Sequence, residues 1–256
     1  MRRTSERISR VRVSVIIPAF NERATIEEII RRVRAVSLQK EILIVDDGSS
    51  DGTREYLASL RDPDVRILLH DRNRGKGAAI RTALPHTTGE VVMIQDADLE
   101  YDPNELVKLI GPIEADEADV VYGSRFLAQG RGSAGMLHYM ANRLLTFLSN
   151  LTTGLPLTDM ETCYKALRGD LARSLELSAD SFNIEPEITA QAAGRGARFV
   201  EVPIGYEGRA ASEGKKIRLK DAFEAVWMIL RCAPRARGGR VGSLRPGNGR
   251  DGHGLD

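Results

Sequence analysis

Two carboxylates separated by one small residue, Asp96-Ala97-Asp98, are the part of this sequence best suited to chemistry. They follow an apolar run at residues 91–95, which has the composition of a buried strand. Carboxylates are costly to bury there unless a cation neutralises them. Oxygen ligands at this density favour Mg²⁺ or Mn²⁺, which bridges a protein to phosphate oxygens and neutralises charge on a departing diphosphate. The alternative is a solvated loop before a helix that starts at Pro103.

Two loops nearer the N-terminus have the residue types for binding a nucleotide. Pro18 is expected to stop sheet pairing at the end of the first apolar run and to leave Phe20 and Glu22 on a loop. A ring and a carboxylate at that place suit a base and a ribose. The alternative is a turn followed by a helix cap at Asn21. After the second apolar run, Asp46 is the predicted nucleotide contact.

A glycine-rich basic turn, Asn73-Arg74-Gly75-Lys76-Gly77, opens a predicted helix. Backbone N–H groups at a helix N-terminus favour an anion, so this turn suits a diphosphate, with Lys76 among the donor contacts. The turn matches neither the G-x-x-x-x-G-K-[ST] phosphate loop nor the G-x-G-x-x-G dinucleotide fingerprint. No such fingerprint follows the first predicted strand either, which disfavours a nicotinamide-dependent dehydrogenase.

Strands and helices that would position these loops alternate along the first half of the chain. Short β-branched runs predict strands, and apolar residues at helical spacing predict helices between them. This order indicates an α/β fold with an open, mostly parallel sheet and helices on both faces, whose ligands bind beyond the carboxyl ends of the strands. The predicted strands are 11–17, 41–45, 65–69, 91–95, 119–122 and 199–204; the predicted helices are 24–36, 53–60, 77–84 and 219–231.

Composition and charge exclude several classes of protein. The chain is 42% hydrophobic and 29% charged, which is typical of a globular domain. Its 37 basic and 36 acidic residues leave no overall field that would attract nucleic acid. No stretch approaches the roughly 20 apolar residues of a membrane-spanning helix. We therefore expect a cytoplasmic protein with a basic N-terminal tail at 1–10, one domain at 11–231, and a disordered Arg/Gly-rich tail at 232–256.

The second half contains an apolar helical face with one basic residue, Arg143, beside it. Core packing is the usual explanation for such a face, and contact with a lipid is the alternative. Further along, Glu185 and Glu187 stand at the start of a predicted helix. Its dipole accounts for Glu187, while Glu185 is expected to face the site. The apolar face consists of Tyr139, Met140, Leu144, Phe147, Leu148 and Leu151.

Taken together, these motifs resemble those of family-two inverting glycosyltransferases with the GT-A fold. The similarity extends over residues 11–231 and is narrowest with dolichyl- or polyprenyl-phosphate mannose and glucose synthases, because Val202-Pro203-Ile204 is followed by Arg209 and by Glu213-Gly214-Lys215. The matching motifs are Ile17-Pro18-Ala19-Phe20-Asn21-Glu22, Val45-Asp46-Asp47-Gly48-Ser49-Ser50-Asp51-Gly52-Thr53, Asn73-Arg74-Gly75-Lys76-Gly77, Asp96-Ala97-Asp98 and Gly123-Ser124-Arg125.

The resemblance implies a role for individual residues of this chain. Metal ligands would be Asp96, Asp98 and Glu100. Nucleotide contacts would be Pro18, Phe20, Glu22, Asp46 and Ala97, with Phe20 replacing a tyrosine that is frequent there. Diphosphate or sugar contacts would be Arg125, Arg209 and Lys215, the last two on a loop that closes over the donor. On the acceptor side, where the resemblance implies amphipathic helices, Arg143 would hold a phosphate and Asp159 would be the acidic residue near the acceptor. Among these, Asp98, Asp159 and Arg125 are the predicted catalytic residues.

The activity expected from the resemblance is transfer of a hexose, with inversion, from GDP-mannose or UDP-glucose to a polyprenyl or dolichyl phosphate. Such a protein would lie in the cytoplasm or peripherally at the inner face of the membrane. One alternative is transfer to a soluble hydroxyl acceptor, for which Asp159 would be the base. Another is a non-catalytic subunit that binds a sugar nucleotide and needs a membrane partner. The two sugar nucleotides fit these motifs equally well.

Overall fold

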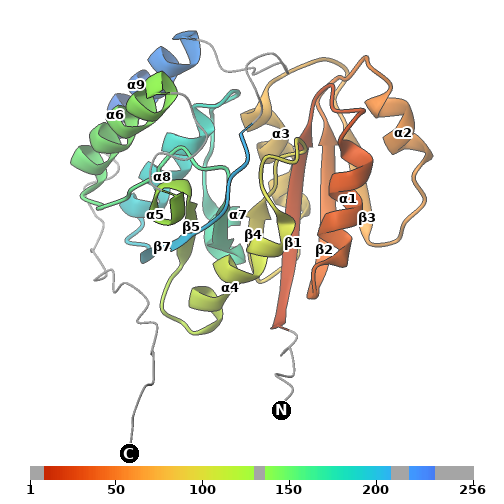
Figure 1. Cartoon of the computed structure of the whole chain (residues 1–256), viewed down its shortest axis with the longest axis horizontal. Coiled ribbons are helices and arrows are strands. Elements are labelled where there is room, and N and C mark those ends of the chain that lie inside the picture. The colour runs from red at the N-terminus through yellow and green to blue at the C-terminus, as the bar shows by residue number, and fades with distance from the viewer. Residues whose placement is uncertain (1–8, 130–135, 209–218, 234–256) are drawn as a thin grey trace, which may run out of the picture.

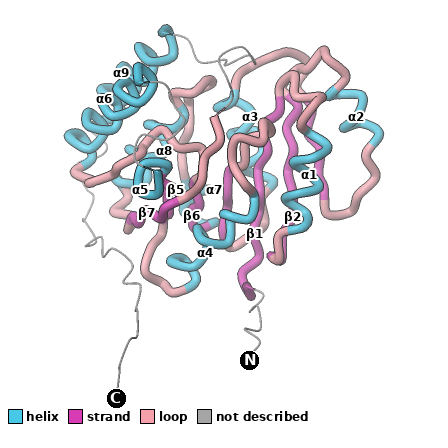
Figure 2. Tube along the Cα trace, in the orientation of Figure 1, coloured by secondary structure: helices cyan, strands magenta, loops and turns pink. Residues whose placement is uncertain are grey.

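The computed structural model describes residues 9–129, 136–208 and 219–233. In this part of the chain, seven strands form one sheet in the order β3-β2-β1-β4-β6-β5-β7, with helices on both of its faces (Figures 1 and 2). The predicted α/β architecture is confirmed. The strands are β1 (Ser9–Ala19), β2 (Leu38–Asp46), β3 (Val65–Leu69), β4 (Val91–Ile94), β5 (Val120–Ser124), β6 (Lys165–Arg168) and β7 (Phe199–Pro203).

One strand of the sheet runs against the others. β1 pairs in parallel with β2 and β4, β2 with β3, and β5 with β7. β6 lies between β4 and β5 and is antiparallel to both, with Ala166 opposite Met93 on one side and Val121 on the other. The sequence patterns did not indicate β6. Because β6 is antiparallel to β4 and β5, its first residue lies at the edge of the sheet where those two strands end.

Strand β1 continues past Pro18, contrary to the expectation that this proline would end the pairing. It extends to Ala19, and Pro18 is in register with Val45 of β2. The physical reason lies on the other side of β1. The oxygen of Ile16 accepts the N–H of Gln95, so Ile16 and Pro18, two positions apart, both direct their backbone groups toward β4. Because β4 ends at Ile94, opposite Ile16, the missing N–H of Pro18 interrupts no ladder.

Helices pack on the sheet through apolar residues at helical spacing. In α1, Ile26, Ile29, Ile30 and Val33 are all buried, as their period predicts. The helices are α1 (Ile26–Ala35), α2 (Thr53–Ser59), α3 (Lys76–Ala83), α4 (Leu106–Glu114), α5 (Arg125–Gln129), α6 (Met136–Thr153), α7 (Gly169–Ser174), α8 (Ile184–Gly194) and α9 (Leu219–Cys232), with short 3₁₀ turns at Leu84–His86 and Pro103–Glu105.

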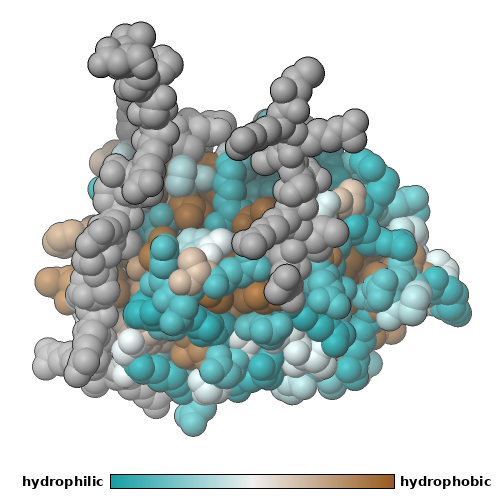
Figure 3. All heavy atoms as spheres, turned by 90° about the horizontal axis from the view of Figure 1, so that it is seen from below, coloured by the Kyte–Doolittle hydropathy of each residue, from teal (hydrophilic) through white to brown (hydrophobic). Residues whose placement is uncertain are grey.

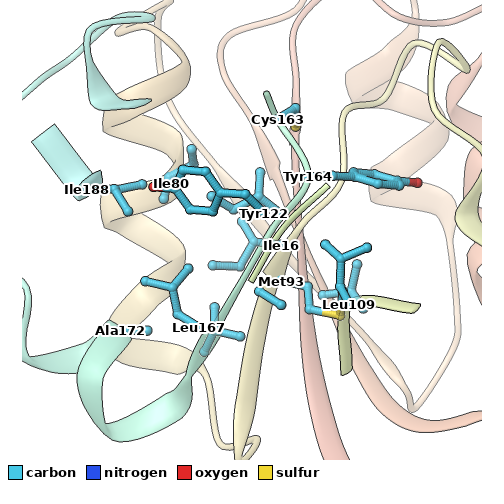
Figure 4. Packing of buried hydrophobic residues seen from close by; sticks show 14 of the residues in the cluster. Ile16, Ile80, Met93, Leu109, Tyr122, Cys163, Tyr164, Leu167, Ala172 and Ile188 are labelled. Carbon is cyan, nitrogen blue, oxygen red and sulfur yellow. The ribbon is translucent and has the colours of Figure 1, made fainter. Parts of the chain in front are cut away.

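The core lies on both faces of the sheet and is nearly continuous. Figure 4 shows Ile16 and Met93 at the centre, with Tyr122 directed toward Ile188 and Tyr164 directed the opposite way. Both tyrosine rings are buried and keep a partner for the hydroxyl: that of Tyr122 pairs with Thr189 at 2.7 Å, and that of Tyr164 donates to Gln95 at 2.6 Å. The central strands are thus anchored by aromatic rings as well as by aliphatic packing.

Three sets of predictions lie outside the described residues. These are residues 1–8 of the predicted N-terminal tail, the loop that bears Arg209 and Lys215, and most of the C-terminal tail; residues 9 and 10, predicted as tail, belong to β1. The roles assigned to Arg209 and Lys215 therefore stay predictions.

A glycine after β2 offers a test of this fold. Gly48 has a φ of +76°, and a Cβ there would lie 2.4 Å from the carbonyl carbon of Arg72. Gly48→Ala should lower the free energy of unfolding by about 3 kcal/mol, because backbone strain and a clash add. Gly154→Ala, at a φ of +74° but with open space, should lose only about 1 kcal/mol. Urea denaturation of both variants is the measurement, and equal losses would contradict the packing of the loop.

Candidate active site

The loops that follow β1 and β2 are tied together at one edge of the sheet. The N–H of Asn21 donates to Ser49 Oγ at 2.9 Å, and the N–H of Ser50 donates to Asn21 Oδ1 at 2.9 Å. Asn21 has a φ of 54° and lies four residues before the cap of α1, which is Thr25, so it links two loops and does not cap the helix. The predicted nucleotide contacts Phe20 and Glu22 lie on this linked loop.

Two consecutive aspartates at the end of β2 have different structural roles. Asp46 is fully buried, and its carboxylate accepts from Arg54 Nε at 2.8 Å and from the N–H of Ser49 at 3.3 Å. Asp47 accepts from the N–H groups of Arg74 and Gly75 at 2.9 and 2.7 Å and pairs with the ring of His70. Asp46 is thus placed at the predicted nucleotide loop, and Asp47 anchors the glycine-rich turn.

Three backbone amides at the glycine-rich turn, which its sequence predicts to bind an anion, already donate to protein oxygens. The N–H groups of Arg74 and Gly75 are taken by Asp47, and the N–H of Ala78 donates to the oxygen of Asp180 at 3.1 Å. These amides are therefore occupied by protein oxygens. The cause lies in two remote segments, whose oxygens the local sequence of the turn does not reveal. What the turn directs at the site is the side chain of Lys76.

A cluster of buried charges surrounds Lys76. Its Nζ lies 2.9 Å from Asp96 Oδ1 and 3.2 Å from Glu185 Oε1, and Lys165 Nζ lies 2.6 Å from Glu185 Oε2. Burial works against the charge on Lys76, but Asp96 and Glu185 outweigh it and hold the pKa of Lys76 well above its usual value. Burial likewise raises the pKa of Asp96, but Lys76 and a hydrogen bond from Cys163 outweigh burial and lower it. Both shifts favour the charged forms of Lys76 and Asp96, which therefore form an ion pair near neutral pH.

The predicted metal ligands lie in the turn after β4. Asp98 Oδ1 accepts from the N–H of Glu100, and Glu100 Oε2 accepts from the hydroxyl of Tyr206 at 2.7 Å. Among the described residues, no three acidic, histidine or cysteine side chains are placed as a ready metal cage. The donor set is nevertheless all oxygen, and Mg²⁺ commonly takes only one or two carboxylates and completes its shell with substrate phosphate and water. Asp96 and Asp98 fit that kind of site, with Ala97 buried between them.

Arg125 and Asp159, both predicted catalytic residues, form a two-pronged ion pair. Nε and Nη2 of Arg125 each lie 2.7 Å from a different oxygen of Asp159, and the N–H of Arg125 adds a third bond at 3.0 Å. Asp159 is fully buried. The ring of Tyr206 lies 5.2 Å from the guanidinium. Burial opposes the charge of Arg125, but neighbours including Tyr101 and Asp159 raise its pKa further. The arrangement fixes the direction of the guanidinium.

Helix α6, predicted to lie on the acceptor side, contacts this ion pair. Asn142 Nδ2 donates to Asp159 Oδ1 at 3.2 Å, and the exposed Arg143 donates to the oxygen of Thr158 at 3.3 Å. The N–H groups of Thr158 and Asp159 donate in turn to the carboxylate of Glu201. The loop before β6 is therefore held between α6 and β7, and it brings Asp159 and Arg143 to the same side of the site.

A second acid in that loop is in an unfavourable setting. Glu161 Oε1 is buried and has no hydrogen-bond partner among the described residues. Burial, followed by the charge of Glu185, raises the pKa of Glu161 to about 7. Its carboxyl is therefore partly protonated at neutral pH.

Most of the apolar face predicted for α6 is exposed, whereas Tyr139 and Leu148 are half-buried. Helices α6 and α9 lie side by side (Figure 1), and large apolar side chains cover their outer surface. In Figure 3 hydrophobic spheres protrude along the left edge, the side on which these helices lie. None of the described helices has the length and apolar character to cross a membrane. The exposed set, called the α6–α9 face below, consists of Met140, Leu144, Phe147, Leu151, Phe223, Trp227 and Leu230.

Comparison with known proteins agrees with this geometry. The profile described as "Glycosyl transferase family 2" matches residues 14–175, which are well over half of the chain and include Asp96 and Arg125. The chain belongs to glycosyl transferase family 2. A family member from Micrococcus luteus, an undecaprenyl-phosphate mannosyltransferase, is 30% identical over 219 residues, which cover 80% of this chain and 87% of that protein.

Other family members are longer than the matched region. A dolichol-phosphate mannosyltransferase from Pyrococcus furiosus is 31% identical over 231 residues, and the match covers 86% of this chain but 63% of the Pyrococcus protein. Among solved structures, glucosyl-3-phosphoglycerate synthase from Mycobacterium tuberculosis has a TM-score of 0.68 at 22% identity, covering 88% of this chain and 80% of that chain. This likeness confirms the predicted GT-A fold.

Several residues of the site were not identified from sequence. Lys165 is fully buried at the start of β6, Glu201 accepts hydrogen bonds from the loop before β6, and the hydroxyl of Tyr206 donates to Glu100. A lysine inside the apolar Cys163-Tyr164-Lys165-Ala166-Leu167 run was a usable signal, because an unpaired buried lysine is costly. Glu187 lies in the first turn of α8, as predicted, and also accepts from the N–H groups of Ser178 and Ala179 at 2.9 and 2.8 Å.

The raised pKa of Glu161 predicts a pH dependence of stability. The unfolded carboxyl loses its proton near pH 4.5, and the folded one only near pH 7. Stability contributed at this site therefore falls as pH rises from about 4.5 to about 7, by roughly 3 kcal/mol. Glu161→Gln should gain stability over the parent as pH rises, measured by urea denaturation between pH 5 and 8. The exposed control Glu117→Gln should show no such trend, and a parallel response of the two variants would refute the assignment.

Proposed function

We propose that the chain is a metal-dependent inverting glycosyltransferase that moves a hexose from GDP-mannose or UDP-glucose to the phosphate of a polyprenyl or dolichyl lipid. Membership of family 2 and the names of the Micrococcus and Pyrococcus relatives support the proposal, since both names specify a polyprenyl-type phosphate acceptor. A protein with this function would work in the cytoplasm or at the inner face of the membrane.

One observation supports a lipid acceptor more than any other. Helix α6 contacts the Arg125–Asp159 pair through Asn142, and the same helix exposes Leu144, at 58%, and Phe147, at 61%, to the outside. An apolar face beside the predicted acceptor side suits a phosphate whose hydrocarbon tail is held in a bilayer. A small soluble hydroxyl acceptor would give no reason for such a face.

In the proposed reaction an acceptor phosphate oxygen attacks the anomeric carbon of the hexose. A new carbon–oxygen bond forms as the bond to the diphosphate breaks, and its electron pair leaves with the nucleoside diphosphate. The acceptor oxygen is already anionic near neutral pH, because the second phosphate pKa is about 6, so no base is needed. Asp159 fits that scheme, because both of its oxygens already accept from Arg125.

Each half of the site then has a separate task. Asp96 and Asp98 would hold a divalent cation, which would neutralise charge on the departing diphosphate. Arg125 is held by Asp159 through Nε and Nη2, while its Nη1 makes no hydrogen bond within the described part of the chain. We assign that nitrogen to a substrate phosphate oxygen. Arg143, exposed on α6, is assigned to the acceptor phosphate.

The first experiment is release of nucleoside diphosphate from UDP- and GDP-sugars with Mn²⁺ or Mg²⁺ and a short polyprenyl phosphate, with and without EDTA. Release that needs both metal and lipid phosphate is expected. In this assay Asp98→Asn should lower the rate roughly 100-fold, since several kcal/mol of charge stabilisation are lost. Asp102→Asn, an exposed turn cap that asparagine can replace, should keep the parent rate.

Three other outcomes would contradict the proposal. Release with a soluble hydroxyl acceptor alone would show that the acceptor is a hydroxyl compound and not a lipid phosphate. Tight donor binding without release under any condition would indicate a binding subunit. Full activity in EDTA would show that the reaction does not require a divalent metal.

The α6–α9 face should bind lipid bilayers. We expect the double variant Phe147→Ser and Leu151→Ser to bind anionic vesicles about tenfold more weakly or worse, because two large apolar side chains no longer enter the interface. Co-sedimentation with vesicles measures this. Val107→Ser is the matched control, since Val107 is 48% exposed on α4 and lies outside the α6–α9 face. An equal loss in the control, or none in the double variant, would count against a membrane-facing role.

A further inference from the structure

The two carboxylates that pair with Lys76 differ in how many cationic partners they have. Glu185 has two cationic partners, Lys76 at 3.2 Å and Lys165 at 2.6 Å. In the described part of the chain, Asp96 has an ion pair with Lys76 alone, at 2.9 Å. If Lys76 moved away, Glu185 would stay neutralised and Asp96 would not. Departure of Lys76 therefore uncovers the very carboxylate that the proposed cation needs.

Lys165 is built to remain in place during such a movement. It is fully buried, and besides Glu185 it donates to the backbone oxygens of Met160 and Thr162, with the ring of Tyr122 4.6 Å away. Lys76 is held less completely. Its side chain is 13% exposed, and its partners in the described structure are the two carboxylates and the more distant ring of Phe182. Of the two lysines, Lys76 is the one that can exchange partners.

The position of Lys76 in the fold also places it where it can bind an anion. It is the first residue of α3, at the end of the helix where the dipole favours an anion. The neighbouring amides of Arg74, Gly75 and Ala78 already donate to protein oxygens. An anion that reaches this end of α3 therefore meets the ammonium of Lys76, while these three amides are already taken.

Charge balance links the two partners. A carboxylate as shielded as Asp96, whose side chain is 19% exposed, is destabilised without a counter-ion, so Lys76 leaves it only when another cation arrives. A divalent cation arriving alone must displace the ammonium into a site that offers it no new anion. A cation arriving with a diphosphate offers one.

We propose that Lys76 is an exchangeable counter-ion of Asp96, which yields that carboxylate to the divalent cation and transfers to the diphosphate of the sugar nucleotide. This step rests on the proposed function and deepens it. Metal and nucleotide then bind cooperatively, and each raises the affinity for the other by the same factor. Lys76 is thus a positioning residue that couples the two ligands.

The test is binding, with Mn²⁺ and with whichever of GDP or UDP the parent protein binds. Free Mn²⁺ is measured by electron paramagnetic resonance, with and without the nucleotide. In Lys76→Met, Mn²⁺ alone should bind about tenfold more tightly than in the parent, and the enhancement by nucleotide should fall toward one. A purely structural role for Lys76 would weaken Mn²⁺ binding, so the sign of the change is decisive. Lys76→Arg should keep most of the coupling, and the distant Lys108→Met should keep all of it.

A measurement on the unaltered protein covers the case in which Lys76→Met does not fold. Trace acylation of amines, read by mass spectrometry, should label Lys76 several-fold faster in saturating Mg²⁺ than without it, and slowly again when nucleotide is added. Unchanged labelling at saturating Mg²⁺, or unchanged coupling in a folded Lys76→Met, would overturn the exchange while leaving the proposed function standing. Failure of Mn²⁺ to bind the parent protein even with nucleotide would overturn both.

Discussion

The direction of β6 is the constraint on which the arrangement of the site depends. Because β6 is antiparallel to β4 and β5, its first residue lies at the edge where those strands end, with Lys165 opposite Tyr122. The loop that leads into β6 therefore meets the turn after β4 and the start of α5. A parallel strand in this place would have taken that loop, and Asp159 with it, to the opposite edge. This one reversal brings Asp159 and Arg125 to the same edge as Asp96 and Asp98.

Buried acids fasten this edge together. Several of them accept from backbone N–H groups of a segment distant in the sequence, and each of these removes otherwise unpaired polar groups and fixes a loop. Asp47 anchors the glycine-rich turn, and Glu201 anchors the loop before β6. Glu161 differs because one of its oxygens has no such partner in the described structure. An acid in that state raises the free energy of the folded protein, which is typical of a site that trades stability for function.

How far the sequence predicted this structure depends on the range of the interactions concerned. The strands that carry Val45 and Ile94 were predicted, because each is an apolar run whose burial follows from its own residues. The short strand β6, four residues with a lysine at one end and an arginine at the other, has no such pattern, and its direction depends on strands β4 and β5. Pro18 was expected to end β1, and only the length of β4 explains why it does not.

The same distinction holds for the site. The position of Asp96 and Asp98 just after a buried strand was predicted correctly, because the apolar run before them is enough to indicate that strand. Which amides of the glycine-rich turn remain for a ligand was not predictable, since Asp47 and Asp180 decide it from elsewhere. The spacing of Leu144 and Phe147 predicted a helical apolar face, but not whether another element covers it. Periodicity gives the face of an element and is silent about its surroundings.

The close approach of the glycine-rich turn to the segment before α8 has a consequence for how family members can be recombined. A Cβ on Gly75 or Gly77 would lie 2.2 or 2.4 Å from the oxygen of Asp180 or Ala179, and Arg81 pairs with Asp180 across 99 positions of sequence. Glu187 sets the path of that segment through Ser178 and Ala179. The surfaces of the glycine-rich turn and of the segment before α8 are therefore complementary in shape. A chimera with a crossover between them would combine surfaces that were never fitted to each other, whereas an exchange that carries both preserves the match.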